Sequence, residues 1–182
     1  MMTDDLINLS ARSVRDLLKD RQVSPLELLD ALERRVNEVD GAVNALPTLC
    51  FERARKRARE RDVSGLPLAG IPVAIKDLLP VSGVRTTFGS MAYHDHIPDA
   101  SDLLVERIEA AGGIVYAKSN TPEFGAGANT FNDVFGFTRN PWNTALSAAG
   151  SSGGSAVALA TGMAWLATGS DLGGSLRNPA SF

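Results

Sequence analysis

Apolar residues recur at helical spacing in the first third of the chain. Val14, Leu17 and Leu18 follow Ser10, a pattern that predicts a short amphipathic helix with a serine N-cap. The tetrapeptide Ser24–Glu27 combines a capping box with proline at the first helical position, so a second helix is predicted to begin there. The buried stripe of this second helix is predicted to contain Leu28, Leu29, Leu32 and Val36.

A third helix is predicted from about Phe51 to Arg61, and its sequence from Arg53 onward is strongly basic. We expect a solvated helix whose cations pair at helical spacing with neighbouring acids, namely Glu52, Glu60 and Asp62. The whole chain carries a net charge of −3 at pH 7, which leaves no broad basic surface. Nucleic acid is therefore not an expected partner.

From Ile71 the pattern changes to short apolar runs that alternate with helical segments. Strands are predicted at residues 71–75, 114–117 and 165–168, and helices at residues 103–111 and 156–162. This alternation predicts an α/β fold with a mixed, largely parallel sheet covered by helices. A chain of 182 residues suffices for one core. We expect one domain with a helical start (about 1–65) and an α/β part (about 66–182).

Composition narrows the class of protein. With 44% apolar and 21% charged residues the chain has ordinary globular values. Cys50 is the only cysteine, so an intrachain disulfide is excluded and a reducing cytoplasm fits. The N-terminus is acidic, with no secretory signal pattern, and no apolar run approaches the roughly 20 residues of a membrane span.

Two serines beside paired glycines are the candidate chemical feature. Ser151 lies in Gly150-Ser-Ser-Gly-Gly-Ser, and Ser175 ends Gly169-Ser-Asp-Leu-Gly-Gly-Ser, 24 positions later (175 minus 151). Glycine lets a substrate approach the main chain closely, so a serine hydroxyl here can act together with backbone N–H donors. The pattern therefore predicts a serine nucleophile.

Other chemistries are less well supported. His94 and His96 are separated by one residue and lack the helical spacing of a metal-binding pair, so a surface loop is predicted for them. The glycine-rich run lacks the Gly-Lys-Ser/Thr of a phosphate-binding loop. Neither a metal nor a nucleotide is expected.

Several ordered motifs together resemble the amidase signature family, from about Leu9 to the last residue. Gly70-Ile-Pro-Val-Ala-Ile-Lys-Asp is similar to the family's lysine-bearing strand, and Asn120-Thr-Pro-Glu-Phe, Phe135-Gly and Asn140-Pro-Trp-Asn are similar to its central stretch. One position departs from the family pattern, because Ala149 stands where a glycine is usual.

This resemblance implies a serine–serine–lysine mechanism. Ser175 would be the nucleophile, Lys76 the base, and Ser151 the relay between them, with a cis peptide bond before Ser151. Backbone N–H groups of the second motif would form the oxyanion hole, at Leu172, Gly173, Gly174 and Ser175. Supporting roles would fall to Gly150, Ser152, Asp171 and Arg177, the last two pairing with the backbone or with each other.

The same residues have simpler interpretations. Lys76 would otherwise be a strand-end lysine that points to solvent and pairs with Asp77. Residues 150–155 would otherwise be a loop that caps the next helix, which is compatible with a catalytic role.

The resemblance implies hydrolysis of a small-molecule carboxylic amide through an acyl-enzyme, with no cofactor. Two alternatives stay open: an amidotransferase A-type subunit that acts on misacylated tRNA, and an inactive fragment or binding module. Asn120-Thr-Pro-Glu-Phe-Gly-Ala-Gly is more similar to free-standing amidases. Family members continue well beyond the second serine motif, so we expect an N-terminal portion that is truncated there and weakly active alone. A homo-oligomer is compatible with the sequence.

Overall fold

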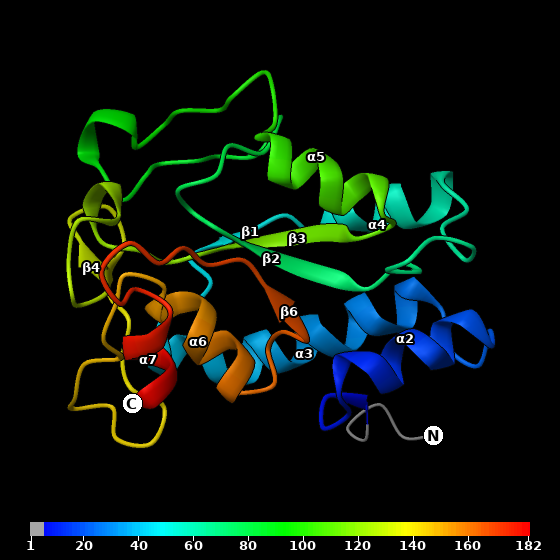
Figure 1. Ribbon diagram of the computed structural model, residues 1–182, viewed down its shortest axis with the longest axis horizontal. Helices are drawn as coiled ribbons and strands as arrows, with labels where there is room; N and C mark the ends of the chain where they lie inside the picture. The colour runs from blue at the N-terminus through cyan, green and yellow to red at the C-terminus, as the bar shows by residue number, and fades with distance from the viewer. Residues whose placement is uncertain (1–5) are drawn as a thin grey trace.

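The fold is built on a four-stranded sheet with the strand order β1-β3-β2-β6 (Figure 1). The computed structural model describes residues 6–182. The strands are β1 (Thr48–Leu49), β2 (Pro72–Lys76), β3 (Ile114–Ser119) and β6 (Leu166–Ala167). β2 runs parallel to both β3 and β6, whereas β1 pairs with β3 in the antiparallel direction. The predicted α/β class with a mixed, largely parallel sheet is confirmed.

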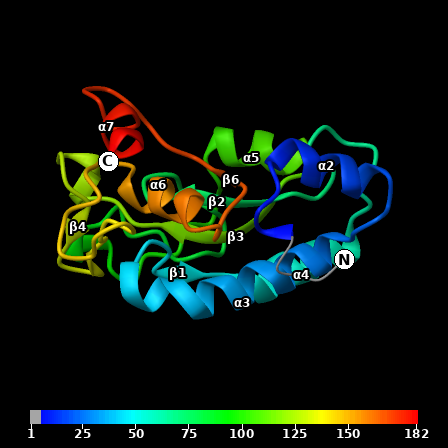
Figure 2. The same ribbon diagram turned by 90° about the horizontal axis from the view of Figure 1, so that it is seen from below.

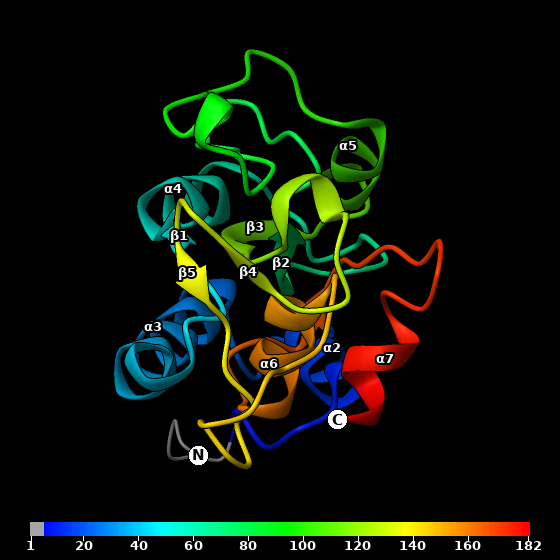
Figure 3. The same ribbon diagram turned by 90° about the vertical axis from the view of Figure 1, so that its left-hand side faces the viewer.

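Helices cover both faces of this sheet. α5 (Leu103–Ala110) lies on one face, and α3 (Pro25–Val43) and α6 (Gly153–Ala160) lie on the other (Figure 3). α4 (Phe51–Glu60) runs beside α3, and α2 (Ala11–Lys19) lies near the start of α3 (Figure 2). The remaining short elements are η1 (Met91–Tyr93), η2 (Glu123–Gly125), the hairpin β4 (Phe131–Asn132) and β5 (Gly136–Phe137), and α7 (Arg177–Ser181).

The N-terminal helices form where their capping signals predict. Ser10 Oγ accepts the N–H of Ser13 at 3.1 Å at the start of α2. The Ser24 N–H donates to the Glu27 carboxylate at 2.8 Å, and the Glu27 N–H donates back to Ser24 Oγ, which completes the capping box of α3. All four residues of the predicted stripe are buried: Leu28, Leu29, Leu32 and Val36.

The basic helix forms two of the predicted ion pairs and adds shorter ones to other helices. In α4, Arg55 lies 2.7 Å from Asp30 and 2.6 Å from Glu33, both on α3. Glu109 of α5 lies 2.9 and 3.2 Å from two further arginines of α4. Of the predicted partners, Glu52 lies 3.9 Å from Arg55 and Glu60 lies 3.9 Å from Lys56, both at helical spacing. Asp62 instead accepts hydrogen bonds from Ser64. The prediction of pairing at helical spacing is confirmed for Glu52 and Glu60 and is wrong for Asp62, and the shorter ion pairs of the helix come from acids of other helices.

The helix predicted at residues 156–162 begins three residues earlier, at Gly153. A Cβ on Gly153 would lie 2.3 Å from Thr130 Oγ1, and one on Gly154 would lie 2.3 Å from the Asn120 backbone nitrogen. Only glycine permits this approach of α6 to the segment after β3. The weak helix propensity of glycine misplaced the predicted start, because packing decides it here.

A β-bulge in β3 sends two neighbouring lysines to opposite faces of the sheet. Val73 pairs with Val115 and Ala74 pairs with Ala117, so Tyr116 is an extra residue in β3. Beyond this bulge, Lys118 faces the segment that follows β2. Lys76, at the end of β2, faces the start of α6 on the other side.

Lys118 and Asp77 form a fully buried ion pair on the face opposite Lys76. Lys118 Nζ lies 3.1 Å from Asp77 Oδ1 and donates to the Leu79 carbonyl at 2.7 Å and to Thr86 Oγ1 at 2.9 Å. The second oxygen of Asp77 accepts the N–H and the hydroxyl of Thr87. The pair thus ties the segment after β2 to the sheet.

Two further predictions concern a secretory signal and a membrane-spanning helix. Residues 1–5, which contribute to the prediction of no secretory signal, lie outside the described residues. Within residues 6–182, no helix is both long enough and apolar enough to cross a bilayer.

Replacing Lys118 by methionine should destabilise the protein by about 3–5 kcal/mol, because Asp77 would be left as an unpaired buried charge. Urea unfolding measures the change. Lys56→Met is the matched control, since Lys56 is exposed and only 3.9 Å from Glu60, and it should change stability by about 0.5 kcal/mol or less. Equal effects of the two substitutions would contradict a structural role for the ion pair.

Candidate active site

The Lys76 side chain ends in a cluster of serine hydroxyls. Lys76 is 1% exposed, and its Nζ donates to Ser151 Oγ at 2.8 Å and to Ser152 Oγ at 2.9 Å. Ser170 Oγ accepts a third hydrogen bond at 2.9 Å. The alternative of a solvent-exposed lysine paired with Asp77 is wrong, because Asp77 pairs with Lys118 on the other face of the sheet.

The surroundings of Lys76 disfavour its charged form. Burial lowers the pKa of Lys76 to about 8, and the nearby Asp171 carboxylate opposes this shift in part. Ser151 and Ser152 directly precede α6, so the positive end of the helix dipole also lies near the amine. A substantial fraction of Lys76 is therefore neutral at mildly alkaline pH.

The loop that carries Ser151 is packed against residues 129–130. The Gly150–Ser151 peptide bond is cis, as the resemblance implies. A Cβ on Gly150 would lie 2.9 Å from the Asn129 carbonyl carbon, so this position requires glycine. Ala149, the departure from the family pattern, adopts a φ of 54° in the left-handed region, and its carbonyl accepts from both the N–H and the hydroxyl of Thr130. These contacts hold alanine in a conformation that glycine adopts more easily.

Asp171 organises the second serine loop. Its carboxylate accepts the backbone N–H groups of Gly174 at 2.7 Å and of Leu176 and Arg177 at 3.2 Å. The Arg177 guanidinium pairs with it at 2.9 Å and holds the pKa of the Asp171 carboxyl well below its ordinary value, with the Gly174 N–H adding to this effect. Both kinds of pairing predicted for Asp171 and Arg177 are present.

The donors predicted for an oxyanion hole are only partly available in this conformation. The Gly174 N–H, one of the four predicted donors, is hydrogen-bonded to Asp171. Across residues 6–182, no acceptor is found for the N–H groups of Leu172, Gly173 and Ser175. Three donors of the predicted set are therefore free.

Ser175 meets the first loop through its backbone. Its carbonyl accepts the Ser152 N–H at 3.0 Å, and its half-buried side chain makes no hydrogen bond within the described part of the chain. The structure thus brings Lys76, Ser151 and Ser152 into direct contact and places Ser175 beside them. Within residues 6–182, the hydroxyls of Ser151 and Ser175 are not hydrogen-bonded to each other.

Sequence reasoning missed two residues of this cluster. Ser170 contacts the Lys76 amine, and Thr168 accepts the Lys76 backbone N–H at 2.8 Å through its hydroxyl. The available signal was position: both hydroxyls lie between the β6 strand and the second serine. Both were overlooked because the charged and glycine residues beside them give a clearer pattern.

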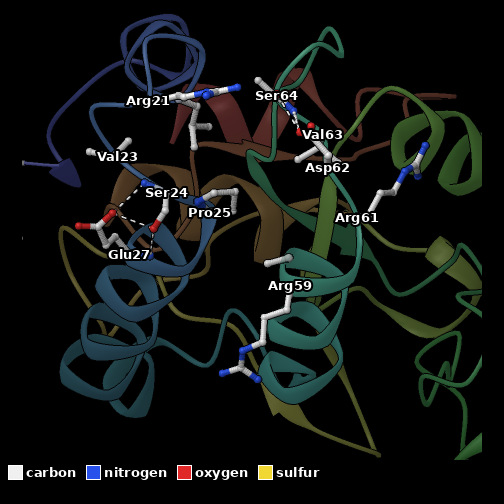
Figure 4. A pocket seen from close by; sticks show the side chains of 13 residues that line it. Arg21, Val23, Ser24, Pro25, Glu27, Arg59, Arg61, Asp62, Val63 and Ser64 are labelled. Carbon is white, nitrogen blue, oxygen red and sulfur yellow. Dashed lines mark hydrogen bonds between the residues drawn. The ribbon is translucent and has the colours of Figure 1, made fainter.

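The histidines and a pocket among the N-terminal helices lie apart from this cluster. His94 and His96 are on an exposed loop beside η1, as predicted. Within residues 6–182, no group of three His, Cys, Asp or Glu side chains is arranged to hold a metal ion. The pocket between α2, α3 and α4 contains none of the cluster residues, and its three arginines point in different directions (Figure 4): Arg21, Arg59 and Arg61.

Comparisons with known proteins identify related sequences. The family model described as Amidase matches residues 27–182. The A-type subunit of the glutamyl-tRNA(Gln) amidotransferase of Methylacidiphilum infernorum is 42% identical over 177 residues, which is 97% of this chain and 36% of that protein. The chain therefore spans little more than a third of the length of this relative.

Solved structures share the same architecture. A 6-aminohexanoate cyclic dimer hydrolase superposes with a TM-score of 0.89 at 35% identity, over 96% of this chain and 36% of that one. A fatty acid amide hydrolase superposes with a TM-score of 0.91 at 27% identity, over 98% of this chain and 32% of that one. Both similarities extend over nearly the whole chain.

The amine of Lys76 should titrate near pH 8. The chain has four lysines, Lys19, Lys56, Lys76 and Lys118, so NMR of protein labelled with 13Cε-lysine gives one signal for each. Lys76→Met assigns the relevant signal by removing it, and the exposed Lys19 and Lys56 supply reference signals. A midpoint near the value of about 10.4 for a free lysine would contradict the effect of burial.

Proposed function

The chain belongs to the amidase signature family, and from this premise we propose that the protein cleaves a small-molecule carboxylic amide through an acyl-enzyme on Ser175. The single observation that carries the proposal is the buried Lys76 amine bonded to serine hydroxyls, with a pKa lowered to about 8. A serine hydroxyl needs a base that takes its proton to become a nucleophile, and the unprotonated fraction of this amine can do so.

The proton path runs through Ser151. The Ser175 hydroxyl attacks the amide carbonyl carbon and gives its proton to Ser151 Oγ, while the Ser151 proton passes to neutral Lys76. The tetrahedral intermediate then collapses, the C–N bond breaks, and the leaving amine takes the proton back along the same path. Water hydrolyses the Ser175 ester in the second half of the reaction. The proton transfer from Ser175 to Ser151 requires a hydrogen bond between the two hydroxyls, which is not formed in the structure.

The free N–H groups of Leu172, Gly173 and Ser175 would stabilise the oxyanion of the intermediate. Loss of one such donor typically costs about 3 kcal/mol of transition-state stabilisation. The Asp171–Arg177 pair supports this loop and does not touch the reacting atoms. Gly174 would join the hole only if its N–H left Asp171.

A second candidate function is supported by the identity of the curated relatives. The relatives at about 42% identity are named as A-type subunits of glutamyl-tRNA(Gln) amidotransferases. An amidotransferase would use the same Ser175 chemistry to release ammonia from an amide donor. Release of ammonia from glutamine but from no simple aliphatic or aryl amide would favour this candidate. Two of the solved neighbours are named as amide hydrolases, which favours direct hydrolysis, and another is named as an A-type amidotransferase subunit, which favours the second candidate.

We also propose a cytoplasmic location for this activity. A chain whose only cysteine cannot form an intrachain disulfide suits a reducing compartment, so we place the activity in the cytoplasm.

Ser175→Ala should abolish covalent labelling by a fluorophosphonate, because the attacking oxygen is removed while Asp171 still holds the loop. Intact-protein mass spectrometry measures the adduct. Ser181→Ala, which removes another hydroxyl near the same end of the chain, should label like the wild type. An adduct on the Ser175→Ala variant would refute the assignment, and an unlabelled wild type would favour the inactive-fragment alternative.

The labelling rate should rise with pH through a midpoint near 8. Below that pH Lys76 carries its proton and cannot accept another, and above it the neutral amine predominates. Ser151→Ala should slow labelling but keep a rising limb, whereas Lys76→Met should remove the limb. A pH-independent rate in the wild type would transfer the role of base to another group.

A further inference from the structure

Thr168 replaces a rung of the β2–β6 ladder with its own side chain. Ala74 pairs with Ala167, and the Thr168 N–H donates to the Ala74 carbonyl at 2.9 Å, as a parallel ladder requires. The next rung would join the Lys76 N–H to the Thr168 carbonyl. The Lys76 N–H donates instead to Thr168 Oγ1, at 2.8 Å.

The displaced carbonyl of Thr168 bonds to a different partner. It accepts the hydroxyl of Ser155, an α6 residue, at 2.7 Å. Ser155 Oγ also lies 2.6 Å from Ser119 Oγ at the end of β3. Ser119 and Ser155 are both buried, so this chain of hydroxyls links two strands and a helix beneath the Lys76 cluster.

The exchange of partners turns the chain out of the sheet at Thr168. Two residues later Ser170 Oγ reaches the Lys76 amine at 2.9 Å. Lys76 is therefore held at both ends by one short segment, at its N–H by Thr168 and at its Nζ by Ser170. The same segment leads directly to Asp171 and the second serine loop.

We propose that Thr168 is a positioning residue, whose hydroxyl occupies the Lys76 N–H and thereby releases the Thr168 carbonyl to Ser155, setting the place of the second serine loop relative to Lys76. This inference rests on the proposed function only for the role of Lys76 as base. Thr168 acts through Lys76 and the loop, and it touches no reacting atom.

The charges around Lys76 are accounted for, so a change in its titration would report its position. Asp171 faces it from the second loop and is paired with Arg177. Asp77 is paired with Lys118 on the opposite face. The segment from β6 and the start of α6 present hydroxyls to the amine.

Thr168→Val keeps the shape of the side chain and removes the hydroxyl. The Lys76 N–H would then recover the Thr168 carbonyl as its acceptor, which draws the chain away from Ser155 and moves Ser170 away from the amine. Water would replace that hydroxyl, so the Lys76 midpoint should rise toward that of a free lysine. Labelling of Ser175 at pH 7.5 should fall roughly tenfold, the size expected for one lost hydrogen bond.

Thr168→Ser restores the hydroxyl without the methyl group and should return both quantities to within about twofold of the wild type. Thr161→Val is the matched control, because the Thr161 hydroxyl bonds only within α6, and it should change neither. Ser155→Ala removes the partner of the Thr168 carbonyl, together with the bond to Ser119, and should give an intermediate loss. It also tests the inference if Thr168→Val does not fold.

The 13Cε-lysine spectrum and the fluorophosphonate rate are measured on the same samples of the 182-residue chain. Wild-type values in Thr168→Val would overturn the inference, because the hydroxyl would then have no effect on Lys76 or on labelling. Failure of Thr168→Ser to restore the values would also overturn it, because the methyl group would then be the part of the side chain that matters. A wild type that does not label would count against the proposed function alone. The Lys76 signal in the four variants would still decide the role of Thr168.

Discussion

A lysine amine removed from water and surrounded by hydroxyls is the constraint on which this site depends. Burial disfavours the ammonium form of Lys76, and serine hydroxyls replace the water that it loses without adding a negative charge. A carboxylate in the same place would keep the amine charged and useless as a base. The fold must therefore supply hydroxyls to Lys76 while it keeps acids away.

The sheet achieves this separation with a single extra residue. The bulge at Tyr116 places Lys118 on the face opposite Lys76, where it pairs with Asp77, the acid that directly follows the catalytic candidate. The other nearby acid, Asp171, is paired with Arg177 and with backbone N–H groups of its own loop. Both carboxylates are thus engaged elsewhere, and the two serines that directly precede α6 accept hydrogen bonds from the amine.

Sequence patterns predicted the features that depend on local chemistry. The capping box at Ser24, the apolar stripe of α3 and the alternation of strands and helices need only neighbouring residues. The family resemblance supplied Lys76, Ser151 and Ser175, and the structure places the first two in contact. Features set by distant residues were not predictable: the start of α6 at Gly153 depends on Thr130, and the pairs of Arg55 depend on another helix. The hydrogen bond of the Thr168 hydroxyl was not predictable either, because nothing local indicates that a hydroxyl will replace a carbonyl in a ladder.

The central claim is that the neutral amine of Lys76 is the base that activates the nucleophile. The most direct test compares two midpoints on one sample: the pH at which the Lys76 13Cε signal is half-shifted, and the pH at which fluorophosphonate labelling reaches half its maximal rate. The account predicts that the two coincide near pH 8. Midpoints that differ by more than about one pH unit would contradict it, because the group that controls the reaction would then be a different one.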